Sequence, residues 1–221
     1  MRPKKNNCLS DGSPSMAFVV SASMALVTTF LTPTSLAADP STNQLIVVVR
    51  HAEKPPAGLG QLTCQGLQRA LRLPAWLARK FPTPDVIFAP DPSVRTTEIH
   101  GDGERYDYVR PLMTIEPTAI ALGMPVNTQL PYYDSGLLAD TLLAPDRRDQ
   151  VIYVAWEHLQ IMNFAQVLLT RFDSDAEVPE WSNADYDTVF AFHIDWAGDP
   201  SVRFEVKKQD LGDLPKRCPS P

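Results

Sequence analysis

A run of five apolar residues, Leu45 to Val49, constrains this chain more than any other stretch, because it leads directly into Arg50 and His51. Four of the five side chains are β-branched, and no polar residue alternates with them. Such a run predicts a strand buried on both faces, as in a parallel sheet. Glu53 and Lys54 follow at once. Ligands bind at this end of the strands in open α/β sheets, so the stretch predicts a site as well as a strand.

A second apolar run ends in the same way. Gln150 to Trp156 has the composition of a buried strand and is followed directly by Glu157 and His158. If both runs are central strands of one parallel sheet, their carboxyl ends meet at the same edge. The two stretches together therefore predict that the imidazoles of His51 and His158 converge in one site.

Helix and strand patterns alternate along the rest of the chain. Helices are expected at 63–80, 111–122, 135–144 and 159–172. Strands are expected at 44–49, 85–89, near 124–126, and at 150–156, 187–194 and 202–207, the last two as an antiparallel pair. Pro74 is expected to kink or split the first helix, and residues 90–109 are expected to form a long loop. This order predicts an α/β fold with a βαβ crossover.

Residues 1–37 have the pattern of a secretory signal peptide, which leaves 38–221 as one domain. The apolar segment from Met16 to Leu31 follows a basic region. The basic residues are Arg2, Lys4 and Lys5. The stretch 35–37, Ser-Leu-Ala, offers the small residues that cleavage before Ala38 needs. We expect an exported protein, periplasmic or secreted, without stable membrane insertion after cleavage. The alternative is an uncleaved membrane anchor.

Two cysteines follow the signal, Cys64 and Cys218. Disulfides form in the oxidising compartments that exported proteins reach. A bridge would tie the C-terminal tail to the first helix. The other reading is a buried Cys64 and a loose Cys218.

Several classes of site do not fit the sequence. The formal net charge of −6 argues against a nucleic-acid-binding face. His51-Ala-Glu53 resembles the opening of the zinc deaminase motif, but the required Pro-Cys-x-x-Cys is absent, and no His or Cys pair has zinc-ligand spacing. Thr63 replaces the third glycine of a dinucleotide-binding turn, and no Gly-x-Ser-x-Gly elbow occurs. We therefore expect no metal and no cofactor.

The residues at the two strand ends suit phosphoryl transfer. A histidine nucleophile needs a neutral ring held in one tautomer. A transferring phosphoryl group needs cations around its oxygens, and guanidinium groups supply them well. A leaving alkoxide needs a nearby acid. Arginine, histidine and carboxylate are all present at these strand ends.

Three stretches resemble the histidine phosphatase superfamily, which has the phosphoglycerate mutase-like fold. Arg50-His51 after the apolar run is similar to that family's Arg-His signature. Residues 62–66, Leu-Thr-Cys-Gln-Gly, resemble its Leu-Thr-x-x-Gly helix start, and 151–158 resembles the strand that presents its second histidine. The likeness covers most of 44–172. It implies a three-layer α/β/α fold with a mostly parallel central sheet.

The resemblance also implies roles for the residues. His51 would accept the phosphoryl group, and Arg50 and His158 would hold its oxygens. In the family a second arginine comes from a Ser-x-Leu-x-Arg-Ala-x-x-Thr-Ala type stretch. The best match here is 110–119, with Thr114 at the arginine position and Arg110 one helical turn earlier. We expect Arg110 to reach the pocket; Arg95 is the other candidate, and a solvated Arg110 is the structural alternative.

The general acid is open between two carboxylates. In much of the family a glutamate comes from a segment between the second arginine and the second histidine, and Asp134 has about that position. Glu157 stands where a glycine commonly precedes the second histidine. It could be the acid, or it could keep His158 cationic, and Glu53 could act on its neighbours in the same way. Lys54 is a further candidate for phosphate attraction.

The sequence thus predicts an exported, metal-independent phosphomonoesterase that acts through a phosphohistidine on His51. Its partner would be a phosphorylated small molecule or another phosphomonoester. The alternative function is a catalytically weak phospho-ligand-binding protein on the same fold. The substrate depends on 90–109 and 130–146, which carry no interpretable motif.

Overall fold

In the computed structural model of this chain, the described residues are 43–99 and 101–219. The predicted signal peptide lies outside them. The strands are β1 (Asn43–Arg50), β2 (Val86–Pro90), β3 (Thr96–Thr97), β4 (Arg105–Tyr106), β5 (Val126–Leu130), β6 (Val151–Trp156), β7 (Thr188–Asp195) and β8 (Ser201–Lys208). The helices are α1 (Cys64–Lys80), α2 (Arg110–Leu122), α3 (Ser135–Leu142) and α4 (His158–Arg171), with a 3₁₀ turn at Pro145–Arg147.

Six strands form one sheet in the order β5-β2-β6-β1-β7-β8. The first four run parallel. β7 pairs antiparallel with β1, and β8 pairs antiparallel with β7 at the edge of the sheet. The apolar run of the sequence is therefore an inner strand, with β6 on one side and β7 on the other. This burial on both faces explains why the run has no polar alternation.

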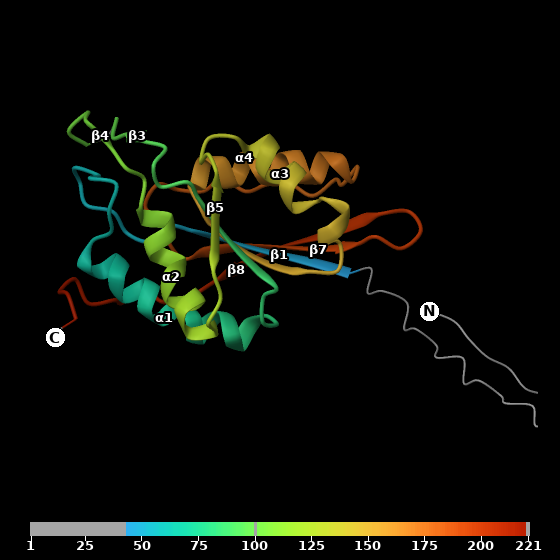
Figure 1. Cartoon of the computed structure of the whole chain (residues 1–221), viewed down its shortest axis with the longest axis horizontal. Coiled ribbons are helices and arrows are strands. Elements are labelled where there is room, and N and C mark those ends of the chain that lie inside the picture. Colours follow the sequence, from blue (N-terminus) through green and yellow to red (C-terminus); the bar gives the residue numbers. More distant parts are fainter. Residues whose placement is uncertain (1–42, 100, 220–221) are drawn as a thin grey trace, which may run out of the picture. The chain divides into compact units, whose positions relative to one another are not determined.

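Alternate side chains of β1 enter two separate cores. Ile46 and Val48 pack in one core with α3 and α4, while Val47 and Val49 pack in the other with α1 and α2. Figure 1 shows the same arrangement, with α1 and α2 on one side of the sheet and α3 and α4 on the other. The predicted three-layer α/β/α architecture is confirmed.

The boundaries of some elements differ from the prediction. Helix α1 runs through Pro74 without a break, so the expected split is wrong. The strand expected near 124–126 lies at Val126–Leu130. The long loop 90–109 contains a two-stranded ladder, in which Thr96 pairs with Tyr106.

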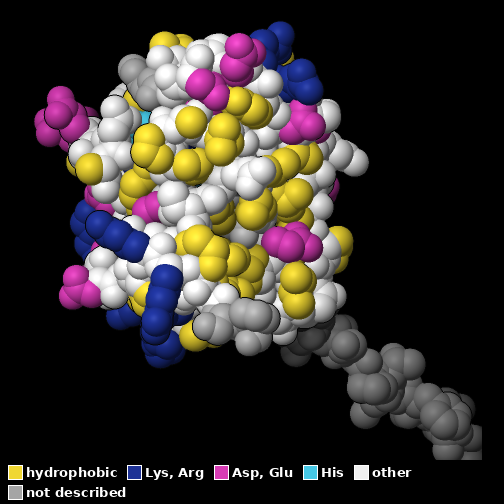
Figure 2. Space-filling model, turned by 90° about the vertical axis from the view of Figure 1, so that its left-hand side faces the viewer, with side chains coloured by type: hydrophobic (Ala, Val, Ile, Leu, Met, Phe, Trp, Pro, Cys, Tyr) yellow, Lys and Arg dark blue, Asp and Glu magenta, His cyan; other side chains and the backbone are white. Residues whose placement is uncertain are grey.

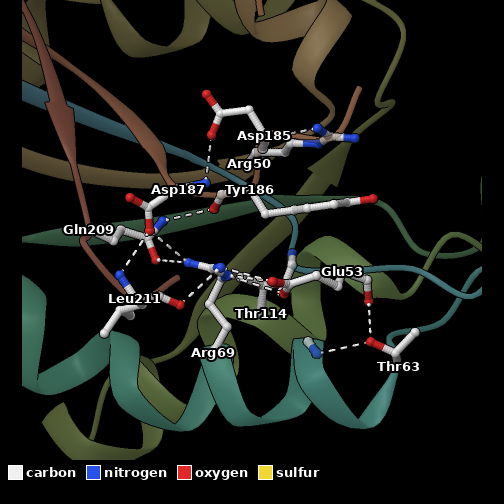
Figure 3. A network of polar contacts seen from close by, with 12 residues as sticks. Arg50, Glu53, Thr63, Arg69, Thr114, Asp185, Tyr186, Asp187, Gln209 and Leu211 are labelled. Atoms are coloured by element: carbon white, nitrogen blue, oxygen red, sulfur yellow. Dashed lines mark hydrogen bonds and ion pairs between the residues drawn. The ribbon is translucent and has the colours of Figure 1, made fainter. Parts of the chain in front are cut away.

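Hydrogen bonds and a disulfide hold the chain after β8 against α1, and further hydrogen bonds join it to Asp187, just before β7. Arg69 in α1 donates to the carbonyl of Leu211, at 3.4 Å, and to the side chain of Gln209, at 3.2 Å (Figure 3). A disulfide joins Cys64 to Cys218, with 4.4 Å between their Cα atoms. The structure thus contains the disulfide, which was one of the two alternatives for Cys64 and Cys218.

Within the described ranges, no helix has the length and apolar character that a membrane crossing requires.

Candidate active site

The two predicted histidines meet where β1 and β6 end side by side. Arg50 is the register partner of Trp156, and the His51 N–H donates to the Trp156 carbonyl at 2.9 Å. His51 is the next residue after β1, and His158 begins α4 after β6, with only the capping residue Glu157 between them. The adjacent parallel strands thus deliver both imidazoles to one edge of the sheet, as the sequence predicted.

The surface over this edge is mostly closed. His51 and Arg50 are each 2% exposed and His158 is 7% exposed. Figure 2 looks onto the molecule from this side, and only a small area of histidine reaches its surface. Apolar side chains spread across the middle of this face, and basic side chains lie nearer its border. A ligand on His51 would therefore be held in a largely dry site, where charges act strongly.

The His51 ring has a fixed tautomer. Its Nδ1 lies 2.8 Å from the carbonyl oxygen of Ala52, so Nδ1–H donates and Nε2 keeps its lone pair. Burial lowers the pKa of His51 well below its ordinary value, and the charges of Arg110 and Arg50 lower it further. The ring is therefore neutral at neutral pH. A neutral imidazole with a free Nε2 is what a histidine nucleophile requires.

Helix α2 fixes the backbone next to this histidine. The buried hydroxyl of Thr114 accepts from the Ala52 N–H at 2.9 Å and donates to the Arg110 carbonyl at 2.7 Å. The Ala52 carbonyl that orients the His51 ring is thereby held in place. This side chain ties the first turn of α2 to the end of β1.

Arg50 lies under the segment that precedes β7. Its Nη1 donates to the carbonyls of Ser182, Asn183 and Asp185 at 3.2, 3.0 and 2.7 Å, and its guanidinium lies 4.1 Å from the centre of the Tyr186 ring. Its Nε is buried without a hydrogen-bond partner among the residues described. The Nη1 of Arg50 is therefore used in hydrogen bonds within the protein, whereas its Nε–H has no partner among the described residues.

Arg110 contributes the second guanidinium of the site. It is 4% exposed, and its Nη1 donates to Glu98 Oε1 at 2.5 Å. Glu98 also accepts from Lys54 at 3.1 Å. As with Arg50, the buried Nε of Arg110 has no hydrogen-bond partner in the described part of the chain. The close approach of Glu98 depends on Gly58, because a Cβ there would lie 2.1 Å from the Glu98 carboxyl carbon, and the backbone φ is +81°.

The His158 ring lies between two side-chain oxygen atoms. Its Nε2 lies 2.6 Å from Asn183 Oδ1, and its Nδ1 contacts the Glu157 carboxylate. Glu157 also caps α4 by accepting from the Gln160 N–H at 2.9 Å. Burial raises the pKa of Glu157, but the hydrogen bonds from His158 and from the backbone outweigh it and leave this pKa below its ordinary value. Glu157 is therefore ionised at neutral pH and positions His158.

Tyr108 is a member of this cluster that the sequence analysis did not single out. It is fully buried, and its ring meets the His51 ring edge-on at 6.2 Å between centroids. The Arg110 guanidinium lies 4.7 Å from the ring centre. Across residues 43–99 and 101–219, its hydroxyl is one of the few buried polar atoms without a hydrogen-bond partner.

Comparison with solved structures identifies the fold of this chain. No family model matches the chain, and no curated protein is found as a relative. SixA from Nakamurella multipartitia, assigned as a phosphohistidine phosphatase, aligns over 76% of this chain and 98% of its own, with 18% identity and a TM-score of 0.52. A protein histidine phosphatase SixA in complex with tungstate aligns over 75% and 97%, with 14% identity and a TM-score of 0.53. This chain has the histidine phosphatase fold.

Within the histidine phosphatase fold, the residues expected at the centre lie together. The pKa of His51 responds to Arg50, Arg110 and His158, and Glu157 contacts His158. Arg110, and not Thr114, is the residue of the 110–119 stretch whose charge acts on His51. Thr114 instead accepts a hydrogen bond from the Ala52 N–H.

The residues expected at the edge of the site have other partners. Arg95 is largely exposed and pairs with Asp107 at 3.0 Å. Asp134 is exposed and caps α3 through the Leu137 N–H at 2.8 Å. Both face solvent, unlike Arg110 and Glu157.

Glu53 and Lys54 follow His51 in the sequence but serve internal ion pairs. Glu53 accepts from Arg69 Nη2 at 2.8 Å, and Lys54 pairs with Glu98. The Leu-Thr-x-x-Gly stretch has a structural role beside them. A Cβ at Gly66 would lie 2.5 Å from the Glu53 carbonyl oxygen, so only glycine lets the first turn of α1 approach this loop.

Proposed function

We propose that this protein is an exported, metal-independent phosphomonoesterase that transfers the phosphoryl group of its substrate to His51. The observation that carries the proposal is a set of buried polar donors left without protein partners beside a neutral histidine, within residues 43–99 and 101–219. These atoms include Arg50 Nε, Arg110 Nε and the Tyr108 hydroxyl. Buried donors without partners cost free energy unless a ligand satisfies them.

The reaction would proceed in two displacements. His51 Nε2 attacks phosphorus, an N–P bond forms, and the bond to the leaving oxygen breaks. Water then attacks the phosphohistidine and releases inorganic phosphate. Arg50, Arg110 and His158 stabilise the charge on the phosphoryl oxygens during both steps. The positive charges of Arg50 and Arg110 perform the task that metal ions perform in other phosphoryl-transfer sites.

The solved proteins with this fold support the substrate class. One SixA is assigned as a phosphohistidine phosphatase, and the other is a protein histidine phosphatase complexed with tungstate. A buried site with two guanidinium groups suits the anionic phosphoryl group of a phosphomonoester. Export is supported by the signal-like pattern of 1–37. The Cys64–Cys218 disulfide fits an oxidising compartment.

The test is phosphate release by the protein without residues 1–37, in the presence of EDTA. Hydrolysis of p-nitrophenyl phosphate is expected for the wild type, and His51→Ala should lose at least about a thousandfold in turnover, because the nucleophile is gone. His193→Ala is the matched control, because that imidazole lies on β7 beside Glu205, away from the site. Full activity in His51→Ala would overturn the covalent mechanism, and loss of wild-type activity in EDTA would overturn metal independence.

The binding-protein alternative draws on one observation. The carboxylate next to His158 is held in its ionised form, so it cannot donate a proton to a leaving group. A protein that only binds would be stabilised against heat by phosphate or tungstate and would release no phosphate from any ester. The same assay therefore separates the two functions.

A further inference from the structure

Tyr108 has a polar group that the fold does not use. Its side chain is fully buried, and its hydroxyl lacks a hydrogen-bond partner within the residues the structure describes. Buried tyrosines usually find a partner for this group. Tyr153 shows the ordinary case, because its buried side chain donates to the Pro82 carbonyl at 2.7 Å. An unpaired hydroxyl beside a nucleophile indicates that a ligand supplies the missing oxygen.

The surroundings of Tyr108 are those of the reaction site. Its ring packs edge-on against His51, and Arg110 lies over its face. Burial raises the pKa of Tyr108 far above its ordinary value, and the Arg110 guanidinium, through its charge and its approach to the hydroxyl, offsets only part of this increase. The hydroxyl therefore keeps its proton in the resting protein, and the positive charge of Arg110 beside the ring lowers the cost of giving that proton up.

The carboxylates of the site are poor proton donors. Glu157 is ionised and holds His158. Burial raises the pKa of Glu98, but hydrogen bonds from Arg110 and Lys54 outweigh it and leave this pKa below its ordinary value. Both oxygens of Glu98 are occupied by cations, Oε1 by Arg110 and Oε2 by Lys54. A leaving alkoxide still needs a proton.

We propose that Tyr108 is the general acid of the reaction and gives its phenolic proton to the leaving oxygen of the phosphomonoester. The inference rests on the proposed function. In the first step the N–P bond to His51 forms, the P–O bond breaks, and the proton passes from Tyr108 to the departing oxygen, which leaves as an alcohol. In the second step the attacking water returns a proton to the phenolate as its oxygen bonds to phosphorus and the N–P bond breaks. Arg110 over the ring stabilises the transient phenolate.

The experiment compares two leaving groups in Tyr108→Phe. An alkyl phosphate such as glycerol 2-phosphate needs a proton at its leaving oxygen, whereas p-nitrophenolate leaves without one. We expect kcat/KM for the alkyl ester to fall by about 10² to 10³, the usual contribution of a general acid, and kcat/KM for p-nitrophenyl phosphate to fall only slightly. Equal losses for both esters, or no loss for either, would overturn the assignment.

Two controls keep the test decisive. Tyr153→Phe removes a buried hydroxyl that has a protein partner, and it should change both esters alike. If Tyr108→Phe does not fold, 3-fluorotyrosine at position 108 preserves the shape and makes the phenol more acidic. It should then alter kcat/KM for the alkyl ester and leave p-nitrophenyl phosphate unaffected; no selective change would overturn the proposal. Failure of the proposed function is distinguishable, because neither ester would then depend on His51.

Discussion

Arg69 and Arg110 are equally buried, at 4% exposure each, yet the fold treats them in opposite ways. Every nitrogen of the Arg69 guanidinium has a partner: Nε and Nη2 bind Glu53, and Nη1 binds Asp187 and Gln209 (Figure 3). Arg110 gives one nitrogen to Glu98, while its buried Nε is unpaired within the described ranges. Arg50 resembles Arg110 in this respect.

The difference separates structure from function. A buried guanidinium with all its donors satisfied joins elements, here α1, the loop after β1 and the chain after β8. A buried guanidinium with a donor to spare carries a cost that the fold alone does not explain. Arg50 and Arg110 lie close enough to His51 for their charges to lower its pKa. Arg69 is not among the main groups that shift this pKa. Substitutions of the two kinds should therefore have different consequences.

The largest effect on stability is expected from Arg69→Met. Removing this cation leaves the Glu53 and Asp187 carboxylates without their partner, and breaking a buried pair costs about 3–5 kcal/mol of unfolding free energy. Urea denaturation measures the loss. Adding Glu53→Gln should recover part of it, because one orphaned charge is removed. kcat/KM of the folded fraction should change little. A large loss of activity without loss of stability would erase the distinction between the two kinds of arginine.

A smaller effect of a different kind is expected from Arg110→Lys. The ammonium keeps a cation beside Glu98 but lacks the guanidinium fork, so turnover of p-nitrophenyl phosphate should fall by about 10² to 10³, as for loss of one oxyanion donor. Unfolding free energy should stay close to the wild-type value. Arg95→Lys is the matched control, since that side chain is exposed, and its activity should be unchanged. The reverse result would place Arg95 in the pocket instead of Arg110.

The smallest effect concerns pH. In the unfolded chain His51 should take up a proton near its ordinary pKa of about 6.5, whereas the folded protein keeps the ring neutral to lower pH. As the pH falls below about 6.5, the unfolded state takes up a proton that the folded state does not bind. The free energy of unfolding therefore falls with falling pH, by up to about 1.4 kcal/mol per pH unit for this group. The loss ends at the pKa of the folded state.

Denaturation curves of the wild type and His51→Asn, taken from about pH 7 to about pH 5, isolate this contribution. The wild type should lose stability more steeply than the variant across that range. Parallel pH profiles would mean that His51 is not held neutral.

The central strands and the first half of the site were predictable because local sequence determines them. The buried Ile-Val runs can only be inner strands, and the polar residues that follow each run must lie at the sheet edge. That reasoning placed Arg50, His51, Glu157 and His158. The helix start at Thr63 was also readable, because its hydroxyl caps α1 through the Gly66 N–H at 3.0 Å.

The residues that complete the site come from loops without local signals. Glu98, Tyr108 and Asn183 reach it through contacts far apart in sequence, and isolated residues of these types carry no pattern. The role of Glu157 was open for a related reason. Whether it donates a proton or holds a histidine depends on burial and hydrogen bonds, which only the folded chain shows.

The most direct test of the central claim is to trap the phosphoenzyme. Wild-type protein mixed with p-nitrophenyl phosphate and quenched within its first turnover should carry an acid-labile phosphoryl group on the peptide that contains His51. His51→Ala should carry none, and Arg69→Met should form it as the wild type does. Steady release of phosphate by the wild type without any such adduct, or an adduct on another residue, would contradict the account.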